Sequence, residues 1–374
     1  MDIAILFFPK SLREGADSTL AGSFIGPVLR DIYLKIKKIL KHSIWCGLLV
    51  LVGGTALLWH LWPQAAAERT GAGPSSFTES NEPIVPIPDH LDLDLKKVEL
   101  GRQLFHDPQL SHDNQISCAS CHNLRTGGSD GRRRSLGING AVGAINAPTV
   151  LNSGFSFSQF WDGRAETLEE QVGFPLQEHS EMGSTWEEVV GKLRQSQKYI
   201  RDFQQSYAGG IRREHIQDAI AVFERSLYTP NSRFDRYLRN PDSVLTAREQ
   251  EGYHLFKTLG CASCHQGINV GGNMYQKLGV MAPYFSDRGN VTKADFGRFN
   301  VTGDHNDLYM FKVPTLRNVE LTAPYFHDGS ANSLEEAVRM MAKYQLGRKL
   351  SSEEVELIVA FLKTLTGELN GKPA

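Results

Sequence analysis

The pentapeptide CASCH stands at residues 118–122 and recurs unchanged at residues 261–265. A related stretch precedes each copy, GRQLF at 101–105 and GYHLF at 252–256. The two pentapeptides together hold four of the five cysteines of the chain. The sequence is therefore built on a duplicated unit, and the fold of one unit predicts that of the other.

Each unit has the pattern of a helical domain. Apolar residues recur at helical spacing from Ile216 to Leu227 and again from Val355 to Leu365. Ser-x-x-Glu and Thr-x-x-Glu capping boxes mark helix starts in the second unit. We find no convincing alternating strand pattern. We therefore predict an all-α fold with two domains in tandem, residues 88–244 and 245–374.

The pentapeptide has a direct chemical meaning. Two thiols three residues apart at a helix start can both bond to the vinyl groups of one haem, and the following histidine then presents its imidazole to the iron. Four thiols could instead bind one zinc, although a zinc site needs no histidine after each pair. Disulfides or redox dithiols are a third interpretation, but no thioredoxin-like βαβ pattern surrounds them. Two covalent c-type haems are the favoured prediction, with the attachment residues Cys118, Cys121, His122, Cys261, Cys264 and His265.

Composition narrows the function classes. The chain has 374 residues, of which 41% are hydrophobic and 22% charged, so it can bury a sizeable core and is neither disordered nor collagen-like. The formal net charge of −2 excludes a nucleic-acid-binding excess of positive charge. Residues 1–42 carry +3, whereas residues 64–374 carry −5. The amino-terminal segment is therefore basic, and the rest of the chain from residue 64, here called the body, is mildly acidic.

The amino-terminal part predicts export. Residues 44–62 contain no Asp, Glu, Lys or Arg, and four lysines precede them, so the positive-inside rule keeps residues 1–42 in the cytoplasm. We predict one transmembrane helix at 43–63, followed by a linker at 64–87. A cleaved signal peptide is the other interpretation, because Ala65-Ala66-Ala67 resembles a cleavage site. Both interpretations place the body in the periplasm, held by the bacterial inner membrane or released from it.

Several further stretches carry a family resemblance. They are NAPTVLN (146–152), QFWDGRAETLEEQ (159–171), EMG (181–183), ERSLYTPNSRFDRYL (224–238), FKVPTLRN (311–318), LTAPYFHDGS (321–330) and QLGRKLS (345–351). Together with the two haem motifs, they make residues 95–368 resemble the bacterial di-haem cytochrome c peroxidase family, which includes the MauG-type enzymes. The resemblance implies an activity, a set of cofactors and a role for each matching residue.

In this family the amino-terminal haem is the peroxide site and the carboxyl-terminal haem receives electrons. The resemblance makes His122 and His265 the proximal ligands. Glu181 matches the distal acid/base, which moves a proton between the two peroxide oxygens. Gln171 matches the distal glutamine that orients the peroxide, and Trp161 matches the aromatic electron relay between the haems.

The resemblance also supplies a sixth ligand for the carboxyl-terminal haem. Met341 aligns with the family's methionine, and Met340 beside it is the alternative. A thioether ligand raises the potential of a haem, which helps it to accept electrons. MauG-type enzymes carry tyrosine at this place, so methionine favours the peroxidases.

A calcium ion is the third expected cofactor. The family's ligands map to the side chain of Asn146 and the carbonyl groups of Thr322 and Pro324, all of them oxygen donors suited to this cation. Water would have to complete the shell, since three protein oxygens are few for calcium.

One position departs from many members of the family. They carry a histidine that blocks the peroxide iron until the other haem is reduced, and this chain has Ile138 there. Isoleucine cannot ligate iron. We therefore expect a five-coordinate oxidised haem that needs no reductive activation. MauG-type enzymes also lack this histidine, so Ile138 favours a MauG-type enzyme, which is the main alternative to a peroxidase.

The sequence thus predicts a peroxidase that reduces hydrogen peroxide to water with electrons from an exported donor such as cytochrome c. The alternatives are a MauG-like oxidase acting on a protein or other substrate, and a di-haem electron carrier. The expected partners are peroxide, the donor and, through the amino-terminal helix, a membrane, but no nucleic acid. A homodimer is one state that the resemblance allows.

Overall fold

The computed structural model describes residues 82–241 and 244–374. Within them the α-helices are α2 (Leu95–Phe105), α3 (Cys118–Cys121), α4 (Leu168–Gln177), α5 (Trp186–Arg194), α6 (Gln197–Ser206), α7 (Arg213–Ser226), α8 (Arg233–Arg239), α9 (Ala247–Thr258), α10 (Tyr284–Arg288), α11 (Phe299–Thr302), α12 (Leu334–Leu346) and α13 (Ser352–Lys363). The strands are β1 (Tyr275–Lys277), β2 (Met310–Lys312), β3 (Glu368–Leu369) and β4 (Lys372–Pro373).

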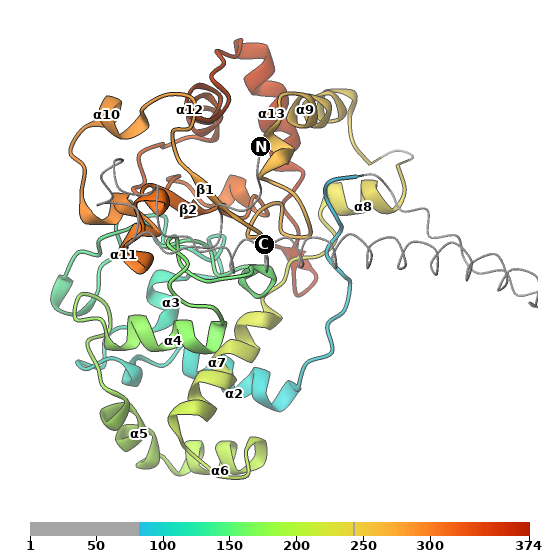
Figure 1. The fold of residues 1–374 in the computed structure, drawn as a ribbon. Coiled ribbons are helices and arrows are strands. Elements are labelled where there is room, and N and C mark those ends of the chain that lie inside the picture. Colours follow the sequence, from blue (N-terminus) through green and yellow to red (C-terminus); the bar gives the residue numbers. More distant parts are fainter. Residues whose placement is uncertain (1–81, 242–243) are drawn as a thin grey trace, which may run out of the picture. The chain divides into compact units, whose positions relative to one another are not determined.

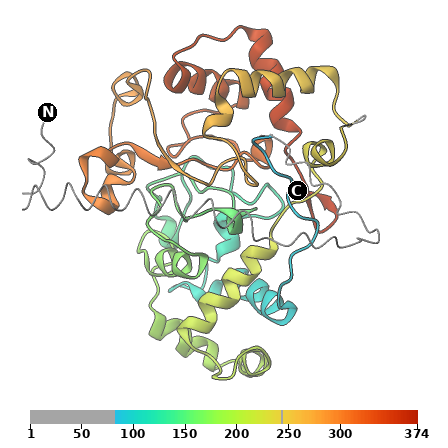
Figure 2. The same cartoon turned by 45° about the vertical axis from the view of Figure 1, so that its right-hand side comes forward.

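The helices form two groups with separate cores. Helices α2 and α4 to α7 enclose the first core, and α8, α9, α12 and α13 enclose the second. Figures 1 and 2 show the first group at the bottom of the molecule and α9, α12 and α13 at the top. A smaller core of Leu278, Tyr284, Phe285 and Phe311 also packs against Trp161, a residue of the first half.

The same close helix crossing organises both halves. Helix α2 crosses α7 at Gly101, where an added Cβ would lie 1.9 Å from the carbonyl oxygen of Ala219. Helix α9 crosses α13 at Gly252, where it would lie 1.9 Å from that of Leu357. Glycine is required at both places by the close approach of the neighbouring backbone. This crossing explains why the GRQLF and GYHLF stretches resemble each other.

A second repeated frame precedes α4 and α12. In each approaching loop one phenylalanine has a positive φ, 68° at Phe160 and 69° at Phe326. A short antiparallel bridge closes each loop. The hydroxyl of Thr167 then accepts a hydrogen bond from the backbone N–H of Glu170 at the start of α4, and that of Ser333 accepts one from Glu336 at the start of α12. The two halves therefore present α4 and α12 in the same local setting.

The ends of the described chain cross between the two halves. Ile84 is buried in the second core, and the backbone here pairs with Gly267 and accepts a hydrogen bond from Arg317. Leu369 and Ala374, at the other end, pack against the first core. The last residues of the segment predicted as a linker are thus part of the packed structure.

The predicted fold class needs correction. The described residues are mostly helical, with two helical cores, but they also form two antiparallel strand pairs, β1 with β2 and β3 with β4. Strands of two or three residues are too short to show an alternating pattern, which is why the sequence did not reveal them. No helix in the described part is long and apolar enough to cross a bilayer, so the described fold lacks the transmembrane helix that the predicted fold class included. The segment for which that helix was predicted, 43–63, lies outside the described residues, as does the tail 1–42.

Candidate functional site

The first CASCH motif forms a single turn of helix. Ser117 and Ser120 cap α3, which places Cys118 and Cys121 one turn apart, and His122 ends the turn. The imidazole Nδ1 of His122 lies 3.3 Å from the carbonyl oxygen of Gly128. A carbonyl oxygen only accepts, so Nδ1 donates and Nε2 keeps a free lone pair. Burial lowers the pKa of His122, which favours this neutral, ligating form.

The second motif repeats this arrangement at the end of α9. Nδ1 of His265 lies 3.4 Å from the carbonyl oxygen of Val270, so Nε2 is again left free. Burial lowers the pKa of His265 to about 4. Cys261 and Cys264 are free thiols, and burial raises the pKa of Cys261 to about 11. Both motifs therefore present two protonated thiols and a neutral imidazole.

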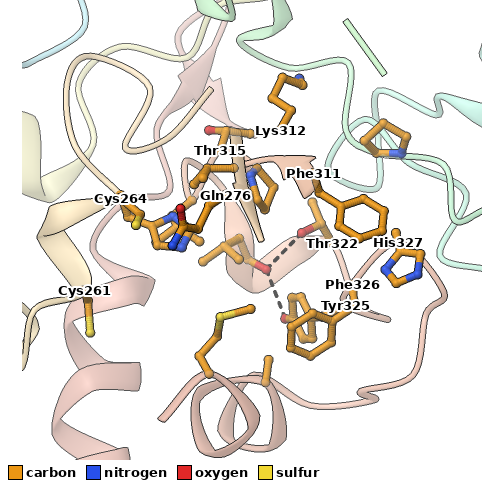
Figure 3. A pocket seen from close by; sticks show the side chains of 18 of the residues that line it. Cys261, Cys264, Gln276, Phe311, Lys312, Thr315, Thr322, Tyr325, Phe326 and His327 are labelled. Carbon is orange, nitrogen blue, oxygen red and sulfur yellow. Dashed lines mark hydrogen bonds between the residues drawn. The ribbon is translucent and has the colours of Figure 1, made fainter. Parts of the chain in front are cut away.

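A cavity of about 520 Å³ adjoins the second motif. Cys261, Cys264 and His265 line it, and so does Met341 on α12. Figure 3 shows the two cysteines in this pocket with aromatic side chains opposite. The size and the apolar, concave lining suit a planar cofactor. The thiols, the free imidazole nitrogen and the thioether together fit a covalently attached haem.

The structure separates the two candidate methionines. Met341 lines the cavity, whereas Met340 lines a groove with Arg339, Lys343 and Tyr344 at the surface. Of the two, Met341 is placed on the side of the haem attachment residues.

The other interpretations of the cysteines find no support in the geometry. All four motif cysteines are unpaired thiols. Within residues 82–241 and 244–374, the one clustering of metal-ligand side chains is Asp295, His327 and Asp328, which includes no cysteine. Arg288 already fills the cation's place in that cluster, because it pairs with both carboxylates at 2.7 and 2.5 Å.

Glu181 lies on the loop after α4, beside the loop that carries Ile138. The backbone N–H of Ile138 donates to the carbonyl oxygen of Glu181 at 2.8 Å, and the Ile138 side chain is buried. Burial raises the pKa of Glu181, and the positive charge of Arg164 partly opposes this. A carboxyl group with a raised pKa can both accept and return a proton near neutral pH.

Gln171 sits one turn into α4, ten residues before Glu181. The hydrogen bonds among the described residues do not join its side chain to that of Glu181. The structure places Gln171 on α4 and Glu181 on the loop that follows it.

Trp161 lies between the halves. Its indole N–H donates to the backbone oxygen of Asn146 at 3.0 Å, and its ring centroid is 6.3 Å from that of His327. Its carbonyl oxygen accepts from the N–H of Lys312 in β2. Trp161 also lines the cavity of the second motif, a position compatible with electron relay between two haems.

The three residues predicted to bind calcium line the same cavity. Asn146, Thr322 and Pro324 all belong to its lining. The side-chain amide of Asn146 donates to the carbonyl oxygen of Arg132 at 2.9 Å, which leaves its Oδ1 available as an acceptor.

Sequence reasoning missed three groups near these sites. Arg164 stacks on Phe160, 3.5 Å from the ring centroid, and acts on the charge of Glu181. His327 bonds Asp295 at 2.7 Å beside Trp161, and Lys312 lines the cavity. Aligning FWDG (160–163) with FHDG (326–329) would have drawn attention to His327, since it shows that Trp161 and His327 are equivalent in the two halves.

Two haem-attachment turns on two repeated helical units define a di-haem c-type cytochrome. Residues 95–243 match the family model described as di-haem cytochrome c peroxidase, and residues 249–366 match that of cytochrome c. The chain is 48% identical to cytochrome c peroxidase Ccp of Escherichia coli (strain K12), over 80% of this chain and 64% of that protein. It is 47% identical to cytochrome c551 peroxidase of Nitrosomonas europaea, over 77% of this chain and 85% of that protein.

Solved structures agree with this likeness. A MauG-like protein associated with microbial copper homeostasis superposes with a TM-score of 0.66 at 31% identity, covering 76% of this chain and 93% of that one. The chain belongs to the di-haem cytochrome c peroxidase family, and the resemblance found in the sequence is confirmed. The two c-type haems are likewise confirmed as cofactors.

Proposed function

We propose that this protein reduces hydrogen peroxide to water with two electrons from an external one-electron donor such as cytochrome c. The chain spans 64% of the length of the Escherichia coli relative, so the activity is inferred from its own residues together with the family. The observation that carries the proposal is the half-buried carboxyl of Glu181, whose pKa is raised, next to the loop of Ile138.

The chain's residues divide the work. When bound, the haem at Cys118 and Cys121 supplies the iron at which the O–O bond is cleaved, and the haem at Cys261 and Cys264 supplies a site for incoming electrons. Glu181 takes a proton from one peroxide oxygen and returns it to the other, so that water can leave. With two protons and two electrons, one peroxide gives two waters. Trp161 bridges the halves for the electrons.

The test is peroxide-dependent oxidation of reduced cytochrome c by fully oxidised, never-reduced protein. We expect rapid turnover that Glu181→Gln lowers by about 10²–10⁴-fold. Glu187→Gln, at an exposed position on α5, is the matched control and should turn over normally. Activity should fall as the pH drops through the raised pKa of Glu181, because the carboxylate is the form that accepts the proton. Equal rates in Glu181→Gln and wild type would contradict the proposal.

We also propose that the peroxide iron is open in the oxidised protein. Ile138 cannot ligate, and its loop is closed on itself by a hydrogen bond from the Gly137 N–H to the Ala141 carbonyl oxygen at 2.8 Å. Electron paramagnetic resonance of never-reduced protein should show a high-spin ferric signal. Two low-spin signals without it would refute the idea, and turnover appearing only after pre-reduction would do the same.

Calcium is proposed as a third cofactor, bound by Asn146, Thr322 and Pro324. Their shared cavity and the free Oδ1 of Asn146 support it. Metal analysis of purified protein should give about one calcium per chain, and Asn146→Leu should lose it. Wild-type protein free of calcium after purification in calcium-containing buffer would contradict this.

For the compartment we propose the periplasm. The lysine-rich tail followed by the uncharged stretch 44–62 supports export. Haem-stained protein in the periplasmic fraction, or in the membrane fraction and open to external protease in spheroplasts, would agree with this, and its presence in the cytoplasmic fraction would not. The domain boundaries and a homodimer stay predictions.

A MauG-like oxidase is the second candidate, favoured by Ile138 and by the solved MauG-like relative. Such an enzyme would oxidise a protein substrate with peroxide and would need no c-type donor. Met341 argues against it, since MauG-type enzymes carry tyrosine there. A plain electron carrier, the third candidate, would be inert to peroxide in the same assay.

A further inference from the structure

Lys312 occupies an unusual position between the two haem motifs. It ends β2, where its backbone N–H donates to the carbonyl oxygen of Trp161 at 2.8 Å. Its neighbours Phe311 and Val313 are buried, and its own side chain lines the cavity of Cys261 and Cys264 (Figure 3). Lys312 itself is half-buried, so its side chain brings a positive charge to the wall of a haem pocket.

Among the residues that the structure describes, no anionic side chain pairs with this charge. Elsewhere among the described residues, Arg317 pairs with Asp235 at 2.7 Å and Arg288 pairs with Asp295 at 2.7 Å, whereas no ion pair includes Lys312. Burial, without any opposing partner, lowers the pKa of Lys312 to about 8. A partly desolvated cation without an anion is unfavourable, so we expect Lys312 to have an anionic partner once the haem is attached.

The residues that line the cavity indicate which anion pairs with Lys312, because none of them can supply one. Its residues, all of them described, include no aspartate or glutamate, and Lys312 is the one lysine or arginine among them. A c-type haem bound at Cys261 and Cys264 brings two carboxylates of its own, the propionates. Its porphyrin otherwise suits the apolar walls.

We propose that Lys312 is a positioning residue that forms an ion pair with a propionate of the carboxyl-terminal haem and thereby keeps that haem easier to reduce. Without the ammonium group, the propionate charge would stabilise the ferric iron and lower its reduction potential. This inference requires the two haems but not peroxidase activity, so it can fail or succeed separately from the proposed function.

The experiment is a spectroelectrochemical titration of both haems in full-length protein without peroxide. Lys312→Met should shift the oxidation equilibrium of the methionine-ligated haem about tenfold toward ferric, which is about 59 mV for one electron. Lys312→Arg should restore the wild-type potential. Lys277→Met removes the same charge from an exposed position on the paired strand β1 and should leave both potentials in place.

Two further measurements guard against misfolding and misassignment. Haem content must stay at two per chain in each variant, and resonance Raman bands of the propionates should change in Lys312→Met alone. An unchanged potential in correctly folded Lys312→Met would overturn the proposal. So would a shift confined to the amino-terminal haem, because the propionate would then belong to the other pocket.

Discussion

Helices α4 and α12 have nearly the same first residues but carry different side chains further along. Thr-Leu-Glu-Glu opens α4 at residue 167 and Ser-Leu-Glu-Glu opens α12 at residue 333. Four residues after the capping hydroxyl, α4 has Gln171 where α12 has Ala337. Eight residues after it, α4 has Pro175 where α12 has Met341.

The difference shows how duplication can yield two unlike haem pockets. The repeated frame fixes where each helix starts, so a single position decides whether a ligating side chain is offered. Met341 provides a thioether at this position, whereas Pro175 has no donor atom in its ring. The first half adds Glu181 on the loop after α4. This difference agrees with the proposed division of roles, in which the second half receives electrons and the first half reacts with peroxide.

The strongest test of this contrast is Met341→Ala. Loss of the thioether should lower the potential of the carboxyl-terminal haem, and each fall of about 59 mV shifts its equilibrium with the donor tenfold. Turnover with cytochrome c should drop accordingly, and the charge-transfer band of methionine-ligated ferric haem should vanish. Met340→Ala is the matched control. If that variant, and not Met341→Ala, lost the band, the ligand would have been assigned to the wrong residue.

The shared helix crossing predicts equal sensitivity in the two halves. Gly101→Ala and Gly252→Ala should each lower the free energy of unfolding by about 1–3 kcal/mol, because the new methyl group meets a backbone oxygen. Denaturant unfolding followed by circular dichroism measures this. Gly191→Ala, in α5 with nothing within 4 Å of the added Cβ, should instead raise stability by about 0.5–1 kcal/mol. A neutral effect at either crossing would break the equivalence.

The two helix crossings also differ in one ionisable residue. Glu224 follows Phe223 at the first crossing, and Leu362 follows Phe361 at the second, with both side chains buried. Burial raises the pKa of Glu224 from 4.5 to about 8. Between these values the unfolded chain has released a proton that the folded chain still holds. The free energy of unfolding should therefore fall as pH rises, by at most about 1.4 kcal/mol per pH unit, and level off above about 8.

Glu224→Gln and Glu224→Leu should both remove this slope. Unfolding curves collected from pH 5 to pH 9 provide the comparison, with the wild-type protein measured in the same buffers. Parallel pH profiles in Glu224→Gln and wild type would show that the carboxyl group does not titrate between the two states.

The sequence was most informative where chemistry requires a fixed local spacing. The CASCH turns, the capped helices and the family were all predictable, because each depends on neighbouring residues. Lys312, His327 and Arg164 were not predicted as functional residues, since their roles depend on contacts across the fold. The strands were not predicted because two or three residues are too few to show an alternating pattern. Ile84 was assigned to the linker because its pairing partner, Gly267, lies far away in the sequence.

The crossing of the chain ends has a consequence for dissection of the protein. Ile84 completes the second core before the first has begun, and Leu369 and Ala374 complete the first after the second is finished. If the chain were divided near residue 243, the first fragment would lack Leu369 and Ala374, which pack against its core, and the second would lack Ile84, which is buried in its core. Each fragment alone should therefore fold poorly, whereas the two fragments mixed together should fold by complementation. The halves resemble each other as repeats, yet they are not interchangeable modules.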